Sequence, residues 1–169
     1  GIACHFANIG VEVLLLDIVP RELTEAETKK GLTLESKAVR NRVVNEHLAN
    51  SLKSKPSPIY SQKFASRITT GNTTDDMAKI ANVDWIIEVV VERLDIKKTV
   101  FEQIEKFRKP GTLVTSNTSG IPIHFMSEGR SDDFQQHFCG TLFFNPARYL
   151  KLFEIIIYSI LIFQIIYSF

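Results

Sequence analysis

The sequence predicts an α/β fold in which a mostly parallel sheet carries helices on both of its faces. Runs of β-branched and apolar residues, typical of buried strands, recur at residues 11–17, 83–92, 113–117 and 138–145. Segments with helical spacing of their apolar residues separate these runs. Strands that alternate with helices favour parallel pairing, because each crossover connection covers one face of the sheet.

In the first half of the chain, Gly10 ends a short helix, and a buried strand follows that closes with Asp17. Apolar residues recur at helical steps between Leu34 and Leu52, which predicts an amphipathic helix that Pro56 ends. The elements expected here are a helix over residues 2–8, a strand over 11–17, a helix over 33–55, a strand over 67–70 and a short helix through residue 80, capped by Thr73 or Thr74.

In the second half, residues 83–92 carry the strongest strand pattern of the chain. The next segment places Ile96, Phe101 and Ile104 on one helical face and is broken by Pro110. The elements expected here are strands over residues 83–92, 113–117, 138–145 and 152–156, and helices over residues 95–107 and 121–128.

Composition is ordinary for a globular domain, with 44% hydrophobic and 23% charged residues in a chain of 169. The formal net charge of +1 gives no electrostatic case for binding nucleic acid. Cys4 and Cys139 are interpreted as reduced, buried thiols of a cytosolic protein, with a single disulfide as the alternative. Zinc-type spacing of Cys and His is absent from the sequence, so no metal site is predicted.

Both ends of the sequence are unusual. The chain begins at Gly1 without an initiator methionine, and we interpret this end as cut. Residues 155–169 are apolar, rich in isoleucine and uncharged, which fits an aggregation-prone β segment. The run is shorter than the ~20 apolar residues of a membrane-spanning helix. We expect the ragged end of an incomplete or wrongly translated gene model, and a membrane anchor is the alternative.

Two predicted strands run into small polar residues, with Thr-Ser-Asn-Thr-Ser at residues 115–119 and Thr-Leu-Phe-Phe-Asn-Pro at residues 141–146. Ligands of open α/β sheets bind at the carboxyl ends of the strands. In sequence and in separation, the two segments resemble the active-site segments of 3-hydroxyacyl-CoA dehydrogenases, the NAD-dependent enzymes of fatty-acid β-oxidation. The resemblance covers residues 1–156.

The resemblance implies a partial NAD-binding Rossmann domain over residues 1–156, which lacks the first strand and a C-terminal helical domain. An aberrant apolar tail then covers residues 157–169. The implied reaction is oxidation of a (3S)-3-hydroxyacyl-CoA to the 3-oxoacyl-CoA with NAD, by a full-length protein that forms a homo-oligomer or part of a multifunctional complex. The glycines that bind the pyrophosphate would precede Gly1, so we expect this chain to bind NAD weakly or undetectably.

Cofactor contacts are expected at five positions apart from the substrate residues. Asp17 closes the second strand of a dinucleotide-binding unit, where an acid accepts hydrogen bonds from ribose hydroxyls, although a strand-terminal Asp can also simply cap a turn. By resemblance, Val89 and Glu92 line the nicotinamide side of the cleft, Lys97 contacts the cofactor, and Asn117 contacts the nicotinamide ribose. The structural alternative is that Glu92 is a capping-region acid and Lys97 a solvated helix charge.

The resemblance assigns substrate binding and catalysis to three residues. Ser119 bonds the substrate oxygen, Asn145 helps to hold both substrate and cofactor (as Ser119 also does), and Glu154 orients the catalytic histidine. That histidine would stand at Leu142, which has no group that can accept a proton. His137 is five residues earlier, before its strand begins. It is therefore expected at the end of that strand opposite to the catalytic position. Leu142 therefore favours the rival hypothesis, a non-catalytic pseudo-enzyme or assembly module with the same fold.

Overall fold

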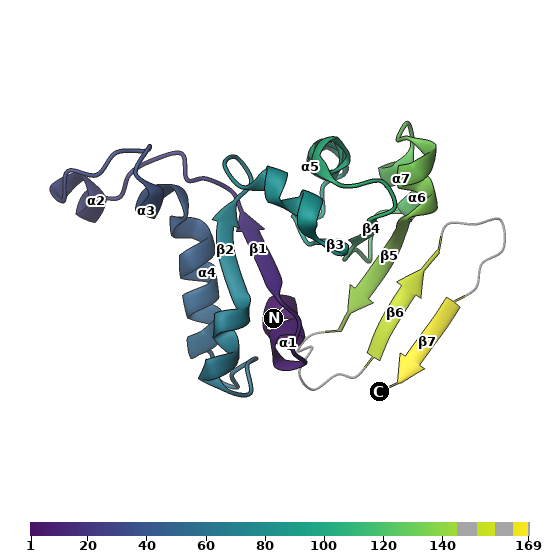
Figure 1. The fold of residues 1–169 in the computed structure, drawn as a ribbon, viewed down its shortest axis with the longest axis horizontal. Helices are drawn as coiled ribbons and strands as arrows, with labels where there is room; N and C mark the ends of the chain where they lie inside the picture. The colour runs from purple at the N-terminus through teal and green to yellow at the C-terminus, as the bar shows by residue number, and fades with distance from the viewer. Residues whose placement is uncertain (145–151, 158–163, 169) are drawn as a thin grey trace. The chain divides into compact units, whose positions relative to one another are not determined.

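The structure is a computed structural model that describes residues 1–144, 152–157 and 164–168. The described residues form two compact units, the first within residues 1–77 and the second within the described residues from 78 onward (Figure 1). Each unit has its own sheet.

The first unit is built on two parallel strands, β1 (Val13–Asp17) and β2 (Ile68–Asn72). Their register places Asp17 opposite Asn72, so both strands end at the same edge. The helices of this unit are α1 (Ile2–Asn8), α2 (Glu25–Lys29), α3 (Lys37–Arg40), α4 (Arg42–Lys53) and the 3₁₀ helix η1 (Gln62–Arg67). Its core is formed by Cys4, Ala7, Ile59 and Ile68, against which Leu48 and Leu52 of α4 pack.

The predicted helix over residues 33–55 is wrong in its first half. The structure breaks it at Asn41 into α3 and α4. Asn41 is buried there, and its side-chain oxygen accepts a hydrogen bond from the side-chain Nδ2 of Asn72 at 2.7 Å. Helix α2 was not expected, although Thr24 and Glu27 form a capping box that the spacing of these two residues could have revealed.

Two further expectations for the first unit need correction. Every residue of β1 is half-buried rather than buried, because among the described strands β1 pairs only with β2. The turn after β2 is capped by Asn72 rather than by Thr73 or Thr74, since the Asn72 side-chain oxygen accepts from the amides of Thr74 and Asp75. The short helix that follows is the 3₁₀ helix η2 (Met77–Asn82).

The second unit contains a five-stranded sheet in the order β3-β4-β5-β6-β7. The first three strands are parallel, and the last two pairings are antiparallel. The strands are β3 (Trp85–Glu88), β4 (Leu113–Ser116), β5 (Phe138–Phe143), β6 (Leu152–Ile156) and β7 (Gln164–Ser168).

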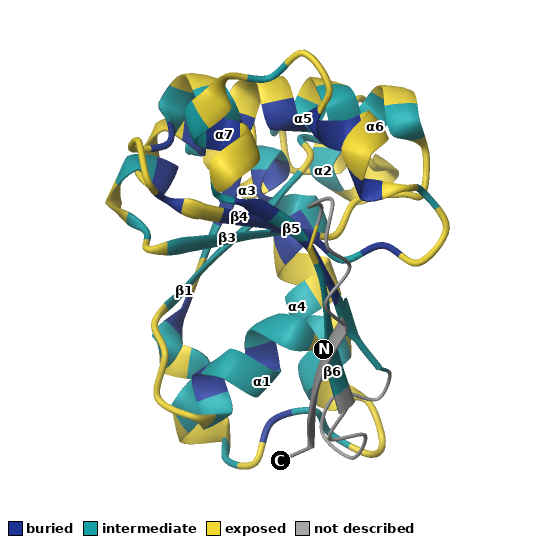
Figure 2. Cartoon of the chain, turned by 90° about the vertical axis from the view of Figure 1, so that its right-hand side faces the viewer, coloured by how far each residue is buried: buried dark blue, intermediate teal, exposed yellow. Residues whose placement is uncertain are grey.

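Three helices of the second unit, α5 (Leu94–Phe107), α6 (Ile123–Ser127) and α7 (Asp132–Gln136), lie on one side of β3, β4 and β5 (Figure 2). Buried aromatic rings join these helices to the sheet. Phe101 of α5 packs edge to face on Phe134 of α7 and Phe138 of β5, with ring centroids 5.8 and 5.1 Å apart. The predicted α5 is confirmed to within one residue, whereas α7 was not expected.

The predicted strand over residues 83–92 is too long. Strand β3 ends at Glu88, whose partner in β4 is the last residue of that strand, Ser116. Beyond this point the Glu88 carboxylate accepts a hydrogen bond from the Val90 amide, and the chain turns toward α5. The valines at positions 89–91 are therefore exposed, with 54%, 36% and 59% of their surface accessible, rather than buried in a sheet.

Residues 164–168 of the apolar tail form β7, which pairs with β6 from Leu152↔Ser168 to Ile156↔Gln164. The β-rich composition of this run is consistent with a strand, although no strand of the fold was predicted there. The predicted boundary at residue 156 and the aberrant nature of the tail stay predictions. None of the helices that the structure describes combines the length and the apolar character needed to span a membrane.

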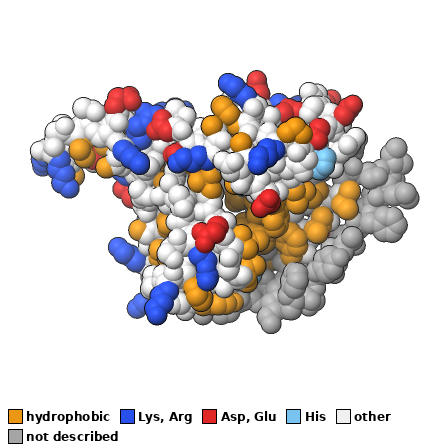
Figure 3. Space-filling view, in the orientation of Figure 1, with side chains coloured by type: hydrophobic (Ala, Val, Ile, Leu, Met, Phe, Trp, Pro, Cys, Tyr) orange, Lys and Arg blue, Asp and Glu red, His pale blue; other side chains and the backbone are white. Residues whose placement is uncertain are grey.

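The predicted α/β class with mostly parallel pairing is confirmed, although the parallel strands are divided between two sheets. Of the two cysteines, Cys4 is buried as expected, while Cys139 is only half-buried, and burial raises the pKa of its thiol. On the face drawn in Figure 3, Lys and Arg side chains are interspersed with Asp and Glu, in keeping with the small net charge.

Candidate active site

The carboxyl end of β3 holds a buried ion pair. Glu88 is the last residue of β3, and its side chain is 1% exposed, while Lys97 of α5 is completely buried. The Lys97 ammonium donates to both Glu88 carboxylate oxygens at 3.0 Å. Ser116 of β4 and the Val90 amide also donate to this carboxylate, each at 2.5 Å. A buried carboxylate with this many donors is well compensated for its lost hydration, and it ties β3, β4 and α5 together.

Glu92 holds the turn that follows β4. One of its carboxylate oxygens accepts from the Thr118 hydroxyl and from the backbone amides of Gly120 and Ile121, the amides at 3.1 and 3.2 Å. The other oxygen lies 3.4 Å from the Lys97 ammonium. Burial alone would raise the pKa of Glu92, but the Thr118 and Gly120 donors and the nearby Lys97 outweigh it, so the pKa is lowered. Glu92 is therefore ionised near neutral pH.

Asn117 connects the carboxyl ends of three strands. It follows directly after β4, and its backbone amide donates to the Glu88 carbonyl oxygen at 2.8 Å. Its side-chain oxygen accepts from the Phe143 amide at the end of β5 at 2.9 Å. Within the described residues no hydrogen bond occupies its Nδ2, so this donor can serve a ligand. Ser119, two residues later, is exposed on the turn that Glu92 holds.

The two strands that contain positions 142 and 154 are neighbours in the sheet. Antiparallel pairing of β5 with β6 places Leu142 directly opposite Glu154. Side chains directly opposite each other in such a ladder lie on the same face of the sheet, with their Cβ atoms about 5 Å apart. A side chain at position 142 therefore lies beside the Glu154 carboxylate, whereas the expected partner residue, Asn145, lies outside the described residues.

His137 lies at the amino end of β5, as predicted. It caps the end of α7, and its Nδ1 atom is 2.7 Å from the carbonyl oxygen of Asp133. His137 therefore lies at the opposite end of β5 from Leu142. Among the described residues, no group of three or more His, Cys, Asp and Glu could hold a metal ion.

In the first unit, Asp17 ends β1 with a half-buried carboxylate. One oxygen accepts from the Ile18 amide at 2.8 Å, and the other lies 2.8 Å from Nδ1 of His47 on α4. His47 is thus a neighbour of the predicted ribose-binding acid that the sequence did not reveal. Thirty residues separate it from Asp17, and no spacing rule connects two residues at that separation in a single sequence.

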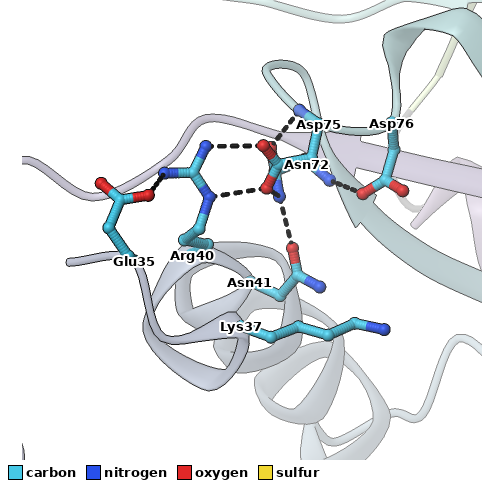
Figure 4. A pocket seen from close by; sticks show the side chains of 7 residues that line it. All are labelled: Glu35, Lys37, Arg40, Asn41, Asn72, Asp75 and Asp76. Carbon is cyan, nitrogen blue, oxygen red and sulfur yellow. Dashed lines mark hydrogen bonds and ion pairs between the residues drawn. The ribbon is translucent and has the colours of Figure 1, made fainter. Parts of the chain in front are cut away.

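A second feature of the first unit is a polar pocket of about 460 Å³ at the carboxyl end of β2 (Figure 4). Arg40 closes one side of it through a two-pronged ion pair with Asp75, in which both distances are 2.6 Å, and a third contact with Glu35 at 3.2 Å. The pocket is lined by Glu35, Lys37, Arg40, Asn41, Asn72, Asp75 and Asp76.

The Arg40–Asp75 pair should make the free energy of unfolding depend on pH in the acidic range. Hydrogen bonds from Arg40 and Asn72 lower the pKa of Asp75 from 3.8 to about 2. A lowered pKa in the folded chain stabilises it above pH 4, and this contribution is lost as the pH falls toward 2. We expect Arg40→Met to reduce the loss of stability between pH 5 and pH 2.5, measured by urea unfolding. Arg21→Met is the control, because Arg21 is exposed. If both variants lose the same stability between pH 5 and pH 2.5, the prediction is contradicted.

Comparison with known protein families identifies a match over residues 1–159 to the family described as 3-hydroxyacyl-CoA dehydrogenase, NAD binding domain. A protein of Bacillus subtilis named probable 3-hydroxyacyl-CoA dehydrogenase is 58% identical over 156 residues, which are 92% of this chain and 20% of that protein. A protein of Rickettsia felis named putative fatty acid oxidation complex trifunctional enzyme is 34% identical over 166 residues, which are 98% of this chain and 21% of that protein.

Among solved structures, 3-hydroxybutyryl-CoA dehydrogenase from Escherichia coli matches 92% of this chain and 29% of its own, with a TM-score of 0.61 and 30% identity. The chain thus spans about a fifth to a third of the length of these relatives. The family match confirms the prediction of an NAD-binding domain.

Proposed function

Because the chain belongs to the NAD-binding domain family of 3-hydroxyacyl-CoA dehydrogenases, we propose that it forms the nicotinamide-binding part of a longer enzyme. The proposed reaction is oxidation of a 3-hydroxyacyl-CoA to the 3-oxoacyl-CoA. The observation that carries the proposal is the arrangement at the end of β5, where Asn117 bonds the Phe143 amide and Glu154 stands opposite position 142.

In each unit, taken by itself, the residues present fit one part of NAD. On the nicotinamide side, the exposed valines at positions 89–91 offer an apolar surface to a planar ring, and the Nδ2 of Asn117 offers a donor to a ribose oxygen. On the adenosine side, Asp17 offers carboxylate oxygens to ribose hydroxyls at the end of β1. Glu92 and Lys97 already contact each other, and their direct contact with the cofactor stays a prediction.

In the proposed chemistry, NAD when bound accepts the hydride, and the protein must bind the hydroxyl and remove its proton. Ser119 is exposed and carries a hydroxyl that can bond the substrate oxygen. Glu154 can orient a base and stabilise its charged form. Leu142 cannot act as that base, so substrate is held but its proton has no acceptor at this position. This residue favours a second candidate function, a pseudo-enzyme that binds ligands without turnover.

We further propose that the chain acts inside a multifunctional assembly on an acyl-CoA substrate. Support comes from the relative in Rickettsia felis, which carries the name of a trifunctional enzyme of a fatty acid oxidation complex and of which this chain spans about a fifth.

The proposal is tested in a chimera in which this chain replaces the matching 156 residues of the Bacillus subtilis relative. We expect the chimera to bind NAD in calorimetric titration, and Asp17→Asn to weaken this binding about tenfold or more, because hydrogen bonds to a charged acceptor are lost. Asp84→Asn is the matched control, since Asp84 is exposed in the second unit. Equal NAD affinity for the two variants, or no binding by the chimera, would refute the proposed function.

A further inference from the structure

Both oxygens of the Glu92 carboxylate contact other residues of the protein. One oxygen collects three donors, which are the Thr118 hydroxyl and the amides of Gly120 and Ile121. All three donors belong to a single turn, residues 118–121, which begins directly after Asn117 and contains Ser119. The approach is close, because a Cβ added at Gly120 would lie 3.4 Å from this same oxygen.

The second Glu92 oxygen forms an ion pair with Lys97. The Lys97 ammonium lies between two carboxylates, with Glu88 at 3.0 Å on the buried side and Glu92 at 3.4 Å on the exposed side. Lys97 is completely buried and also lies 3.5 Å from the Val90 carbonyl oxygen. The contacts from Glu88 through Lys97 to Glu92 therefore link the end of β3 to the exposed turn.

We propose that Glu92 is a positioning residue, which Lys97 and Glu88 hold in place and which fixes the turn of residues 118–121. Through this turn it sets the directions in which Asn117 and Ser119 face the nicotinamide and the substrate. The ligands that Asn117 and Ser119 face are taken from the proposed function. The role of Glu92 in fixing the turn does not depend on that function.

The test compares three variants of the 169-residue chain by NMR. Glu92→Ala removes the acceptor, Glu92→Gln keeps an acceptor oxygen for the same three donors, and Glu102→Gln is the control on the exposed face of α5. In Glu92→Ala we expect amide hydrogen exchange at Gly120 and Ile121 to accelerate about ten- to a hundredfold, the size expected for losing hydrogen bonds to a charged acceptor. Glu92→Gln should restore most of the protection, and Glu102→Gln should match the unmodified chain.

The second measurement is a titration of the same proteins with millimolar NAD, followed through the resonances of Asn117 and Ser119. We expect these resonances to shift in the unmodified chain and in Glu92→Gln, and the shifts to be largely lost in Glu92→Ala while the amides of α5 keep their protection. Unchanged exchange at Gly120 and Ile121 in Glu92→Ala would overturn the proposal. So would faster exchange with an undiminished response to NAD. An unmodified chain that does not respond to NAD agrees with the weak binding expected of it, and hydrogen exchange then decides alone whether Glu92 fixes the turn. The proposed function is decided separately, by the NAD titration of the chimera.

Discussion

Replacing Leu142 by His is expected to raise turnover of a short 3-hydroxyacyl-CoA by about 10²–10⁴-fold, the usual contribution of a general base. The variant is made in the chimera with the Bacillus subtilis relative, so that the rest of the enzyme is present. The physical reason is the register of β5 and β6, which places position 142 opposite Glu154. An imidazole there has a carboxylate beside it that can orient the ring and stabilise its protonated form. Formation of NADH is followed by absorbance.

Two further chimeras make the result specific to proton transfer. Leu142→Gln introduces a polar group that cannot act as a base near neutral pH, and it should leave turnover at the Leu142 level. Leu142→His combined with Glu154→Gln should recover only part of the gain, because the imidazole keeps its place but loses the charge beside it. If the chimera with Leu142 is already as fast as the one with His, the base lies elsewhere and our assignment of this strand is wrong.

Lys97→Met is expected to lower the free energy of unfolding by about 3–5 kcal/mol, because it leaves the buried Glu88 carboxylate without its counter-ion. Both side chains of this pair are at most 1% exposed, so solvent cannot replace the lost ammonium. Unfolding in urea can be followed through Trp85, which is the single tryptophan of the chain. Its indole donates to Thr115 at 3.0 Å and packs on the ring of Phe153, so its emission reports on this sheet.

The controls separate the buried pair from an ordinary surface charge. Glu88→Gln together with Lys97→Met removes both charges and should recover most of the lost stability. Lys98→Met removes a neighbouring lysine whose contact with Glu128 is exposed and 3.6 Å long, and it should cost less than about 1 kcal/mol. A cost for Lys97→Met as small as that for Lys98→Met would show that the Glu88 carboxylate is not held in a buried ionised state.

The place where the proposed chemistry would lie can be predicted from the sequence alone. A strand that runs into Ser116 and Asn117 is visible without a structure, because the change from β-branched to small polar residues is local. Helix α5 was equally visible from the spacing of its apolar residues, and the structure places it within one residue of the prediction. The end of β3 was not visible, since Val89 to Val91 have the same local preference as the strand before them.

Which of these residues contact one another is visible only in the tertiary structure. Lys97 could be interpreted from sequence as a solvated helix charge, and the fold instead buries it against Glu88, nine residues away along the chain. His47 meets Asp17 across thirty residues, and Leu142 meets Glu154 through strand register. Hydrophobic periodicity records which face of an element is buried, but it contains no information about which distant side chain lies opposite. Register and packing supply that partner, and with it the charge and the hydrogen bonds on which the proposed chemistry depends.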